Sequence, residues 1–116
     1  MVLYENSDGI ATVTLNRPAQ LNAWTAQMNI DYCGAMAEAE EDGDVRVVIL
    51  TGAGDRGFCA GADMSLLSGL AGGEGGGTSV EGELREVQLD DDTRADFRQQ
   101  FSWPMGMKKP VICAVN

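Results

Sequence analysis

The sequence predicts an α/β fold, and three observations lead to this prediction. Two short apolar segments, 2–5 and 10–15, flank a turn signal and indicate a β-hairpin. Apolar residues then recur at helical spacing over 25–41, and a nearly continuous apolar segment follows over 45–51. A helix between two such strands predicts parallel strands joined by a right-handed crossover.

The hairpin is predicted from Asp8-Gly9, because Asp-Gly is favoured in tight turns between antiparallel strands. The residues after this turn alternate as in a half-buried strand, with Ile10, Thr12 and Thr14 on one face and Ala11, Val13 and Leu15 on the other. Asn16-Arg17-Pro18 should end this strand, since proline lacks the N–H that a sheet would use.

The helix is expected to begin after Thr25, a favourable N-cap residue, and to run to about Glu41. Its apolar stripe is predicted to lie in the core: Met28, Tyr32, Ala35, Met36 and Ala39. Gly34 should reduce the stability of this helix by up to about 1 kcal/mol relative to alanine. The acidic residues at its end are predicted to form a solvated face: Glu38, Glu40, Glu41 and Asp42.

The strand over 45–51 is apolar enough to be covered on both faces. The turn Gly52-Ala53-Gly54 and the segment Arg56–Met64 follow it, and helix-compatible residues come next. The first N–H groups of a helix lack intrahelical partners and lie at its positive end. This segment is therefore predicted to favour an anion or a developing oxyanion.

The composition changes over 68–92, which contains the run Gly72–Gly77. Glycine runs lose much conformational entropy when they are fixed, so this region is predicted to be a mobile surface insert. It does not match a nucleotide-binding loop, because no Lys-Ser or Lys-Thr follows the glycines.

The last part of the chain leaves one alternative open. Asp90-Asp91-Asp92 either caps a helix that contains Phe97 and Phe101 or forms a solvated acidic turn. Pro104 should end or kink such a helix. The apolar residues 111–116 predict a further strand.

The chain has 116 residues, which fits one small domain or part of a larger one. Its net charge of −10 argues against binding to nucleic acid or to an anionic membrane surface. The local candidates for contact with a phosphate-bearing ligand are Arg17, Arg56, Lys108 and Lys109. We find neither a signal peptide nor an apolar run near the roughly 20 residues of a membrane span, and therefore expect a cytoplasmic protein.

The reactive residue types are few. Three cysteines without short pairing motifs do not indicate a disulfide framework, and the absence of histidine excludes histidine triads and histidine metal sites within this chain. Cys33 and Cys113 are predicted to lie in the core, and Cys59 is predicted to be a small buried residue rather than a nucleophile. Asp63 either caps the following helix or has a functional role, as a substrate contact or as an acid or base. No metal site is expected.

Three segments of this chain have the same order and approximate spacing as in a known family. They are Ile10–Pro18 with Leu21-Asn22-Ala23-Trp24, Val45–Gly52 with Gly57-Phe58-Cys59-Ala60-Gly61-Ala62-Asp63-Met64, and Lys109–Asn116. With these segments the chain resembles the crotonase family, also called the enoyl-CoA hydratase/isomerase superfamily. The resemblance covers nearly the whole chain apart from the Gly-rich insert.

The resemblance implies that residues 1–116 are the N-terminal part of a single crotonase-like domain, a spiral of ββα units, in a homo-trimer or hexamer. It implies an acyl-CoA thioester as substrate, with coenzyme A as part of that substrate and no separate cofactor. By position, the backbone N–H of Ala62 is implied as the first donor of an oxyanion hole. The other implied substrate-binding residues are Ala19, Gln20, Leu21, Ala23, Ala60, Gly61, Asp63 and Met64.

The sequence departs from the family pattern at Ala19 and Gln20, where many relatives have a lysine nearby. The family's second oxyanion donor, a glycine N–H, and its acid/base carboxylates would lie beyond Asn116. We therefore expect the same or another chain to complete the fold, and this chain alone to be inactive. The implied function is an enoyl-CoA hydratase or isomerase that stabilises a thioester enolate. A non-catalytic acyl-CoA-binding or assembly subunit, a thioester hydrolase and a decarboxylase remain alternatives.

Overall fold

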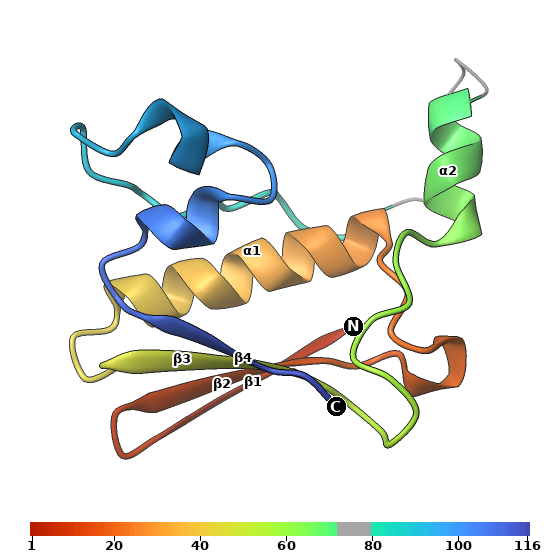
Figure 1. The fold of residues 1–116 in the computed structure, drawn as a ribbon, viewed down its shortest axis with the longest axis horizontal. Helices are drawn as coiled ribbons and strands as arrows, with labels where there is room; N and C mark the ends of the chain where they lie inside the picture. Colours follow the sequence, from red (N-terminus) through yellow and green to blue (C-terminus); the bar gives the residue numbers. More distant parts are fainter. Residues whose placement is uncertain (72–79) are drawn as a thin grey trace.

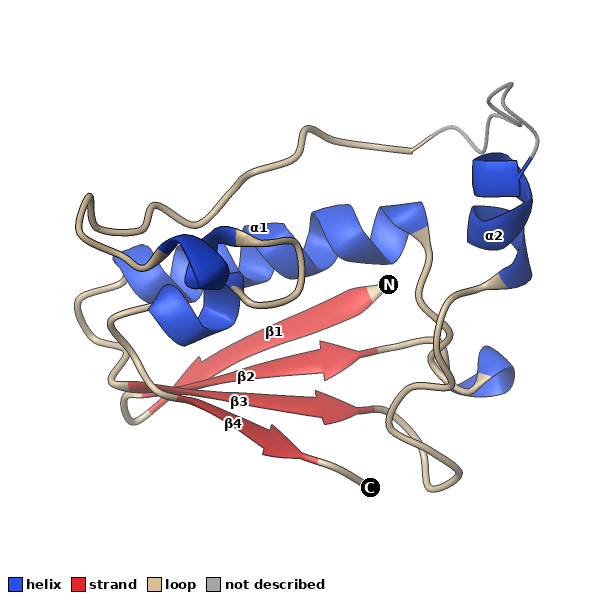
Figure 2. Cartoon of the chain, turned by 45° about the horizontal axis from the view of Figure 1, so that its top comes forward, coloured by secondary structure: helices blue, strands red, loops and turns tan. Residues whose placement is uncertain are grey.

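The computed structural model describes residues 1–71 and 80–116, which form a four-stranded sheet with a long helix across one face (Figure 1). The strands are β1 (Val2–Ser7), β2 (Ile10–Leu15), β3 (Val47–Gly52) and β4 (Val111–Ala114). They lie side by side in the order β1-β2-β3-β4 (Figure 2). The first pair is antiparallel and the next two pairs are parallel. The helices are α1 (Ala26–Glu41), α2 (Met64–Ala71) and the short 3₁₀ helices η1 (Pro18–Gln20), η2 (Ala95–Arg98) and η3 (Trp103–Gly106). The predicted α/β class is confirmed.

The β1–β2 hairpin turns at Asp8-Gly9, as predicted. Both residues have positive φ, 53° for Asp8 and 80° for Gly9. Two residues in this conformation give a turn whose twist matches that of the flanking strands, which explains the preference for Asp-Gly. Ser7 consequently pairs with Ile10, and this register places alternate residues of β2 on the two faces of the sheet.

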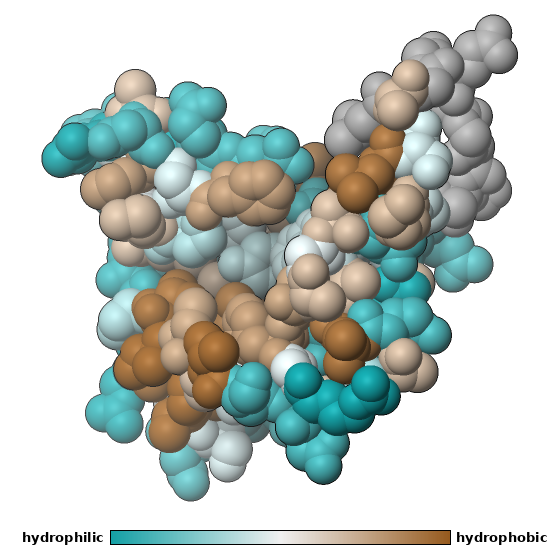
Figure 3. Space-filling view, turned by 45° about the vertical axis from the view of Figure 1, so that its right-hand side comes forward, coloured by the Kyte–Doolittle hydropathy of each residue, from teal (hydrophilic) through white to brown (hydrophobic). Residues whose placement is uncertain are grey.

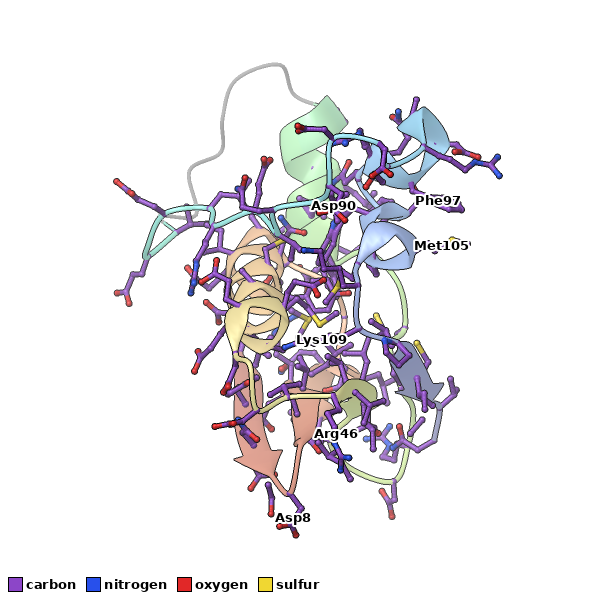
Figure 4. The ribbon with its side chains drawn as sticks, turned by 90° about the vertical axis from the view of Figure 1, so that its left-hand side faces the viewer. Asp8, Arg46, Asp90, Phe97, Met105 and Lys109 are labelled. Carbon is purple, nitrogen blue, oxygen red and sulfur yellow. The ribbon has the colours of Figure 1, made fainter. Side chains whose placement is uncertain are left out.

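Helix α1 begins where the sequence predicts. The backbone N–H of Met28 donates to Oγ1 of Thr25 at 3.0 Å, so Thr25 caps the helix. All five residues of the predicted apolar stripe are buried. At the other end, Nζ of Lys109 donates to the carbonyl oxygens of Ala39 and Asp42. This lysine lies between the end of α1 and the sheet and joins the start of β4 to the helix (Figure 4).

The core lies between α1 and one face of the sheet. On β2 the alternation is the predicted one, with Ala11, Val13 and Leu15 at most 1% exposed. Met28 and Met36 of α1 are fully buried in the same cluster. Burial of these side chains is the main source of stability for this part of the chain.

Two predictions about burial are wrong. Strand β3 is covered on one face only, because α1 lies on a single side: Val48 and Leu50 are buried, whereas Val47 and Ile49 are half-buried. Cys113 is exposed rather than in the core, because β4 is an edge strand of the sheet. Hydrophobic side chains accordingly gather on the surface of the sheet layer (Figure 3).

The region 68–92 differs along its length. Residues 68–71 are the end of α2. Residues 72–79, with the whole run Gly72–Gly77, lie outside the described residues. Residues 80–92 are mostly exposed and form neither helix nor strand. The mobility of this region stays a prediction.

The predicted helix with Phe97 and Phe101 does not form as one helix. Phe97 lies in η2, which ends at Arg98 because the next residue, Gln99, is extended, and Phe101 lies outside it with 77% of its surface exposed. Asp90-Asp91-Asp92 forms an exposed acidic turn, the second of the two alternatives. Pro104 lies in the first turn of η3, where its missing N–H breaks no helical bond.

Candidate functional site

The connection between β3 and α2 returns to the segment 21–24 and pairs with it. The N–H of Ala60 donates to the carbonyl of Leu21 at 3.0 Å, and the N–H of Trp24 donates to the carbonyl of Gly61 at 2.8 Å. The N–H of Asp63 then donates to the carbonyl of Trp24 at 2.8 Å. These three bonds fix the Ala60–Met64 turn against the segment that follows β2.

Ala62 lies at the centre of this pairing, in a parallel bridge with Trp24. In a parallel bridge one residue bonds to both neighbours of its partner, so the N–H and C=O of the partner point away. Trp24 makes the two bonds, and Ala62 is exposed. Within residues 1–71 and 80–116, the N–H of Ala62 has no hydrogen-bond acceptor. An outward N–H beside a helix start can bind an oxygen that carries negative charge.

Gly61 gives the turn its shape. Its φ is +104°, a conformation that residues with a side chain rarely adopt. A Cβ at this position would have nothing within 4 Å, so the requirement for glycine comes from the backbone and not from lack of space. The conformation leads the chain from the Leu21 contact into α2.

Asp63 is the N-cap residue of α2. Its Oδ1 accepts from the N–H of Ser65 at 2.9 Å and from Ser65 Oγ at 2.7 Å. Its Oδ2 accepts from Nη1 of Arg17 at 3.1 Å. The bonds from Ser65, followed by the bond from Arg17, lower the pKa of Asp63 to about 2. Of the two sequence interpretations, the structure shows the helix cap, and a contact with substrate stays a prediction.

The candidate basic residues mostly contact this chain itself. Nη1 of Arg17 also donates to the carbonyl of Ala23 at 2.7 Å. Nζ of Lys108 lies 3.4 Å from Asp90 Oδ1, and Lys109 caps α1. Arg56 is exposed on the β3–α2 connection. Arg17 is therefore a support of the turn.

Asn22 is a residue of this site that the sequence interpretation missed. It is fully buried, its φ is +53°, and its side chain bonds to three backbone groups. Asparagine adopts this conformation more readily than most residues and bonds its neighbours through a short side chain. The available signal was an asparagine four residues after Pro18, in a segment where the chain must turn.

The other residues that are implied to bind substrate lie on both of the paired segments, 21–24 and 60–64, and on the neighbouring helix η1. Leu21 and Ala23 adjoin the Ala60–Met64 turn, whereas Ala19 and Gln20 lie exposed on η1. Met64 is the first residue of α2 and is 74% exposed. Cys59, which the sequence predicts to be buried, is half-buried. A cavity of about 730 Å³ opens beside the turn, and its lining includes Arg17, Thr25 and Ser65.

Two kinds of site are not found in the part of the chain that the structure describes. It holds no group of three or more His, Cys, Asp or Glu side chains that could bind a metal ion. It also contains no helix with the length and apolar character needed to cross a bilayer.

Sequence and structure comparisons define the class. Residues 5–116 match the family model described as enoyl-CoA hydratase/isomerase. The chain is 34% identical to the short-chain-enoyl-CoA hydratase of Clostridium acetobutylicum over 117 aligned positions, covering 99% of this chain and 38% of that protein. It is 35% identical to the 1,2-epoxyphenylacetyl-CoA isomerase of Escherichia coli over 115 aligned positions, which cover 99% of this chain and 39% of that protein.

Solved structures agree with these matches. A carnitinyl-CoA dehydratase from Mycobacterium avium superposes with a TM-score of 0.66 at 34% identity, covering 99% of this chain and 39% of that one. An enoyl-CoA hydratase from Mycobacterium tuberculosis superposes with a TM-score of 0.65 at 36% identity, covering 99% of this chain and 38% of that one. The fold is the N-terminal part of the crotonase fold.

The chain belongs to the enoyl-CoA hydratase/isomerase family, also called the crotonase superfamily. It spans 38% or 39% of the length of these four relatives. The region that they share with it is their N-terminal part. The predicted family and fold are therefore confirmed.

Proposed function

We propose that the Ala60–Met64 turn binds the thioester carbonyl of an acyl-CoA, with the N–H of Ala62 as a donor to its oxygen. The observation that carries this proposal is the outward N–H of Ala62, between two neighbours whose backbone groups are bonded to Trp24. Membership of the enoyl-CoA hydratase/isomerase family supports an acyl-CoA as the ligand.

The proposed chemistry places negative charge on the thioester oxygen. Removal of a proton from the α-carbon, or addition of water to the β-carbon of an enoyl thioester, moves an electron pair toward that oxygen and gives an enolate. A donor that is already in place stabilises this charge without reorganisation. Loss of one such donor typically reduces kcat by about 10²–10³.

The remaining site residues have supporting roles in this proposal. Ala60, Gly61, Asp63 and Met64 form the turn, and small residues at 60–62 let the carbonyl approach the main chain. Ala19, Gln20, Leu21 and Ala23 line the coenzyme A side. Coenzyme A is part of the substrate, and no separate cofactor takes part.

The proton-transfer groups and the second donor are proposed to come from the rest of the fold, on the same or another chain, in a trimer or hexamer. One observation supports this division. Both carboxylate oxygens of Asp63, the acid in the turn, already accept bonds from Ser65 or Arg17. The same observation favours a second candidate function, an acyl-CoA-binding subunit without chemistry of its own.

The experiment compares Ala62→Pro with Ala62→Ser. Proline removes the N–H of residue 62 but breaks no bond with Trp24, because that residue bonds only to the neighbours of Ala62. Serine keeps the N–H. Infrared spectroscopy of an acetyl-CoA with a ¹³C-labelled thioester carbonyl measures how far binding lowers the carbonyl stretching frequency.

We expect a lowered frequency with wild type and Ala62→Ser, and a much smaller change with Ala62→Pro. No change on binding to wild type, or an equal change with Ala62→Pro, would contradict the proposed donor. Turnover of a short enoyl-CoA, measured with the rest of the fold present on the same or another chain, distinguishes the two candidate functions. A donor effect with turnover supports the enzyme, and a donor effect without it supports the binding subunit.

A further inference from the structure

We propose that Asn22 is a positioning residue that fixes the direction of the Ala62 N–H. This inference rests on the proposed function, because it assigns Asn22 a role in the same oxyanion site. Asn22 does not belong to the turn itself. It acts through the backbone segment that pairs with the turn.

The side chain of Asn22 joins three parts of the chain. Its Oδ1 accepts from the N–H of Arg17 at 2.8 Å. Its Nδ2 donates to the carbonyl of Ala53 at 3.0 Å and to that of Gly57 at 3.1 Å. These three bonds use both hydrogens of the amide and one lone pair of its oxygen. Asn22 is 0% exposed, so water does not substitute for a lost bond without entering the packed junction.

The backbone around Asn22 holds the turn directly. The preceding residue, Leu21, accepts from Ala60, and Trp24 bonds to Gly61 and Asp63. The side chain therefore anchors the near end of the β3–α2 connection, at 53–57, while the backbone on either side of it pairs with the far end, at 60–63. A change in the position of Asn22 must move both ends.

The junction leaves little room for movement. A Cβ on Gly52 would lie 3.0 Å from Nδ2 of Asn22 and 2.5 Å from the carbonyl oxygen of Phe58. The hollow between η1 and the connection is about 30 Å³ and is lined by Pro18, Leu21 and residues 53–57. The segment is held by close packing as well as by hydrogen bonds.

Direction matters for a catalytic donor more than for a structural one. A donor stabilises an oxyanion when it points at the position that the oxygen will occupy. A displacement of about 1 Å can reduce a rate by about 10²-fold even when it originates outside the reacting groups. Substitution of Asn22 should therefore reduce the polarisation of a bound thioester carbonyl by more than the loss of folding stability explains.

Two variants separate the side-chain bonds from the backbone conformation. Asn22→Gly keeps access to the positive φ and loses all three side-chain bonds. Asn22→Asp keeps the acceptor for Arg17 but places a carboxylate oxygen against the carbonyls of Ala53 and Gly57. Both are made in a Gly34→Ala background, which is expected to add stability to α1. The control, Met36→Ala, removes a fully buried side chain of α1 in the core.

The experiment measures the thermal midpoint of each variant and the frequency change of the labelled thioester carbonyl of acetyl-CoA on binding, below every midpoint. We expect both Asn22 variants to lose more than half of the wild-type frequency change, and Met36→Ala to keep it despite an equal or larger loss of midpoint.

An unchanged frequency in the Asn22 variants would overturn the inference, as would an equal reduction in Met36→Ala. Failure of both Asn22 variants to fold would also overturn it, because it would assign Asn22 to global stability. If wild type itself shows no frequency change, the proposed function fails, so the two failures are distinguishable.

Discussion

Trp24 and Ala62 form a parallel bridge in which the backbone of Trp24 makes both hydrogen bonds and that of Ala62 makes neither. The bonds run from Trp24 N–H to Gly61 and from Asp63 N–H to Trp24, each 2.8 Å long. The pairing thus holds Ala62 in place while leaving its N–H directed outward. A group held in this way is ready to bind a ligand without rearrangement of the chain.

The Asp63 cap should make stability depend on pH in the acid range. Because the pKa of Asp63 falls from 3.8 to about 2 on folding, the unfolded chain takes up this proton first as the pH is lowered. Its contribution is present above about pH 4 and is lost as the pH falls through about 2. The thermal midpoint of wild type should exceed that of Asp63→Asn at neutral pH and approach it at low pH.

Ser65→Ala is the companion variant for Asp63. The side-chain bond from Ser65 is the largest cause of the lowered pKa, so its removal should make the acid loss of stability smaller and complete it at a higher pH. A difference between wild type and Asp63→Asn that stays constant down to pH 2 would show that the charge of Asp63 is unimportant.

The Thr25 cap should stabilise α1 through one hydroxyl bond. Thr25→Ala removes the acceptor for the N–H of Met28 and should reduce the free energy of unfolding by about 1 kcal/mol. Thr25→Ser keeps an oxygen at the same place and should lose much less. Urea denaturation measures both values. Equal losses for the two variants would mean that the methyl group, and not the cap, is responsible.

Gly52 and Gly34 should respond to alanine in opposite directions. At Gly52 the nearest atoms to a new Cβ belong to the backbone of Phe58, 2.5 and 2.9 Å away, which cannot rotate aside. Gly52→Ala should therefore lower the free energy of unfolding by about 1–3 kcal/mol.

At Gly34, in the middle of α1, a Cβ meets nothing within 4 Å. Gly34→Ala should therefore raise the free energy of unfolding by about 0.5–1 kcal/mol. Chemical denaturation of the two variants gives this comparison. No destabilisation by Gly52→Ala would contradict the close packing at the end of β3, and destabilisation by Gly34→Ala would contradict the open space around that position.

Local signals explain what the sequence could predict. The Asp8-Gly9 turn, the Thr25 cap and the buried stripe of α1 each depend on residues close together in the chain. The strand, turn and helix-compatible residues over 45–64 predict a helix start, and α2 begins at Met64. In these cases local preference and the final structure agree.

Contacts between residues far apart in the chain explain what the sequence pattern could not predict. The bonds of Asn22 reach residues 31 and 35 positions away, and nothing in the local pattern marks their acceptors. The exposure of Cys113 depends on the position of β4 at the sheet edge, which an apolar pattern does not encode. Phe97 and Phe101 have helical spacing, yet the backbone is extended at Gln99 between them.

The most direct test of the central claim is the amide NMR signal of Ala62 in the ¹⁵N-labelled chain, followed during titration with acetyl-CoA. We predict that this amide exchanges rapidly with water in the free protein, whereas those of Ala60 and Asp63 are protected by their bonds. At saturation the Ala62 proton should move downfield and its exchange should slow. An Ala62 amide that is already protected in the free protein, or one that is unchanged at saturation, would contradict the account.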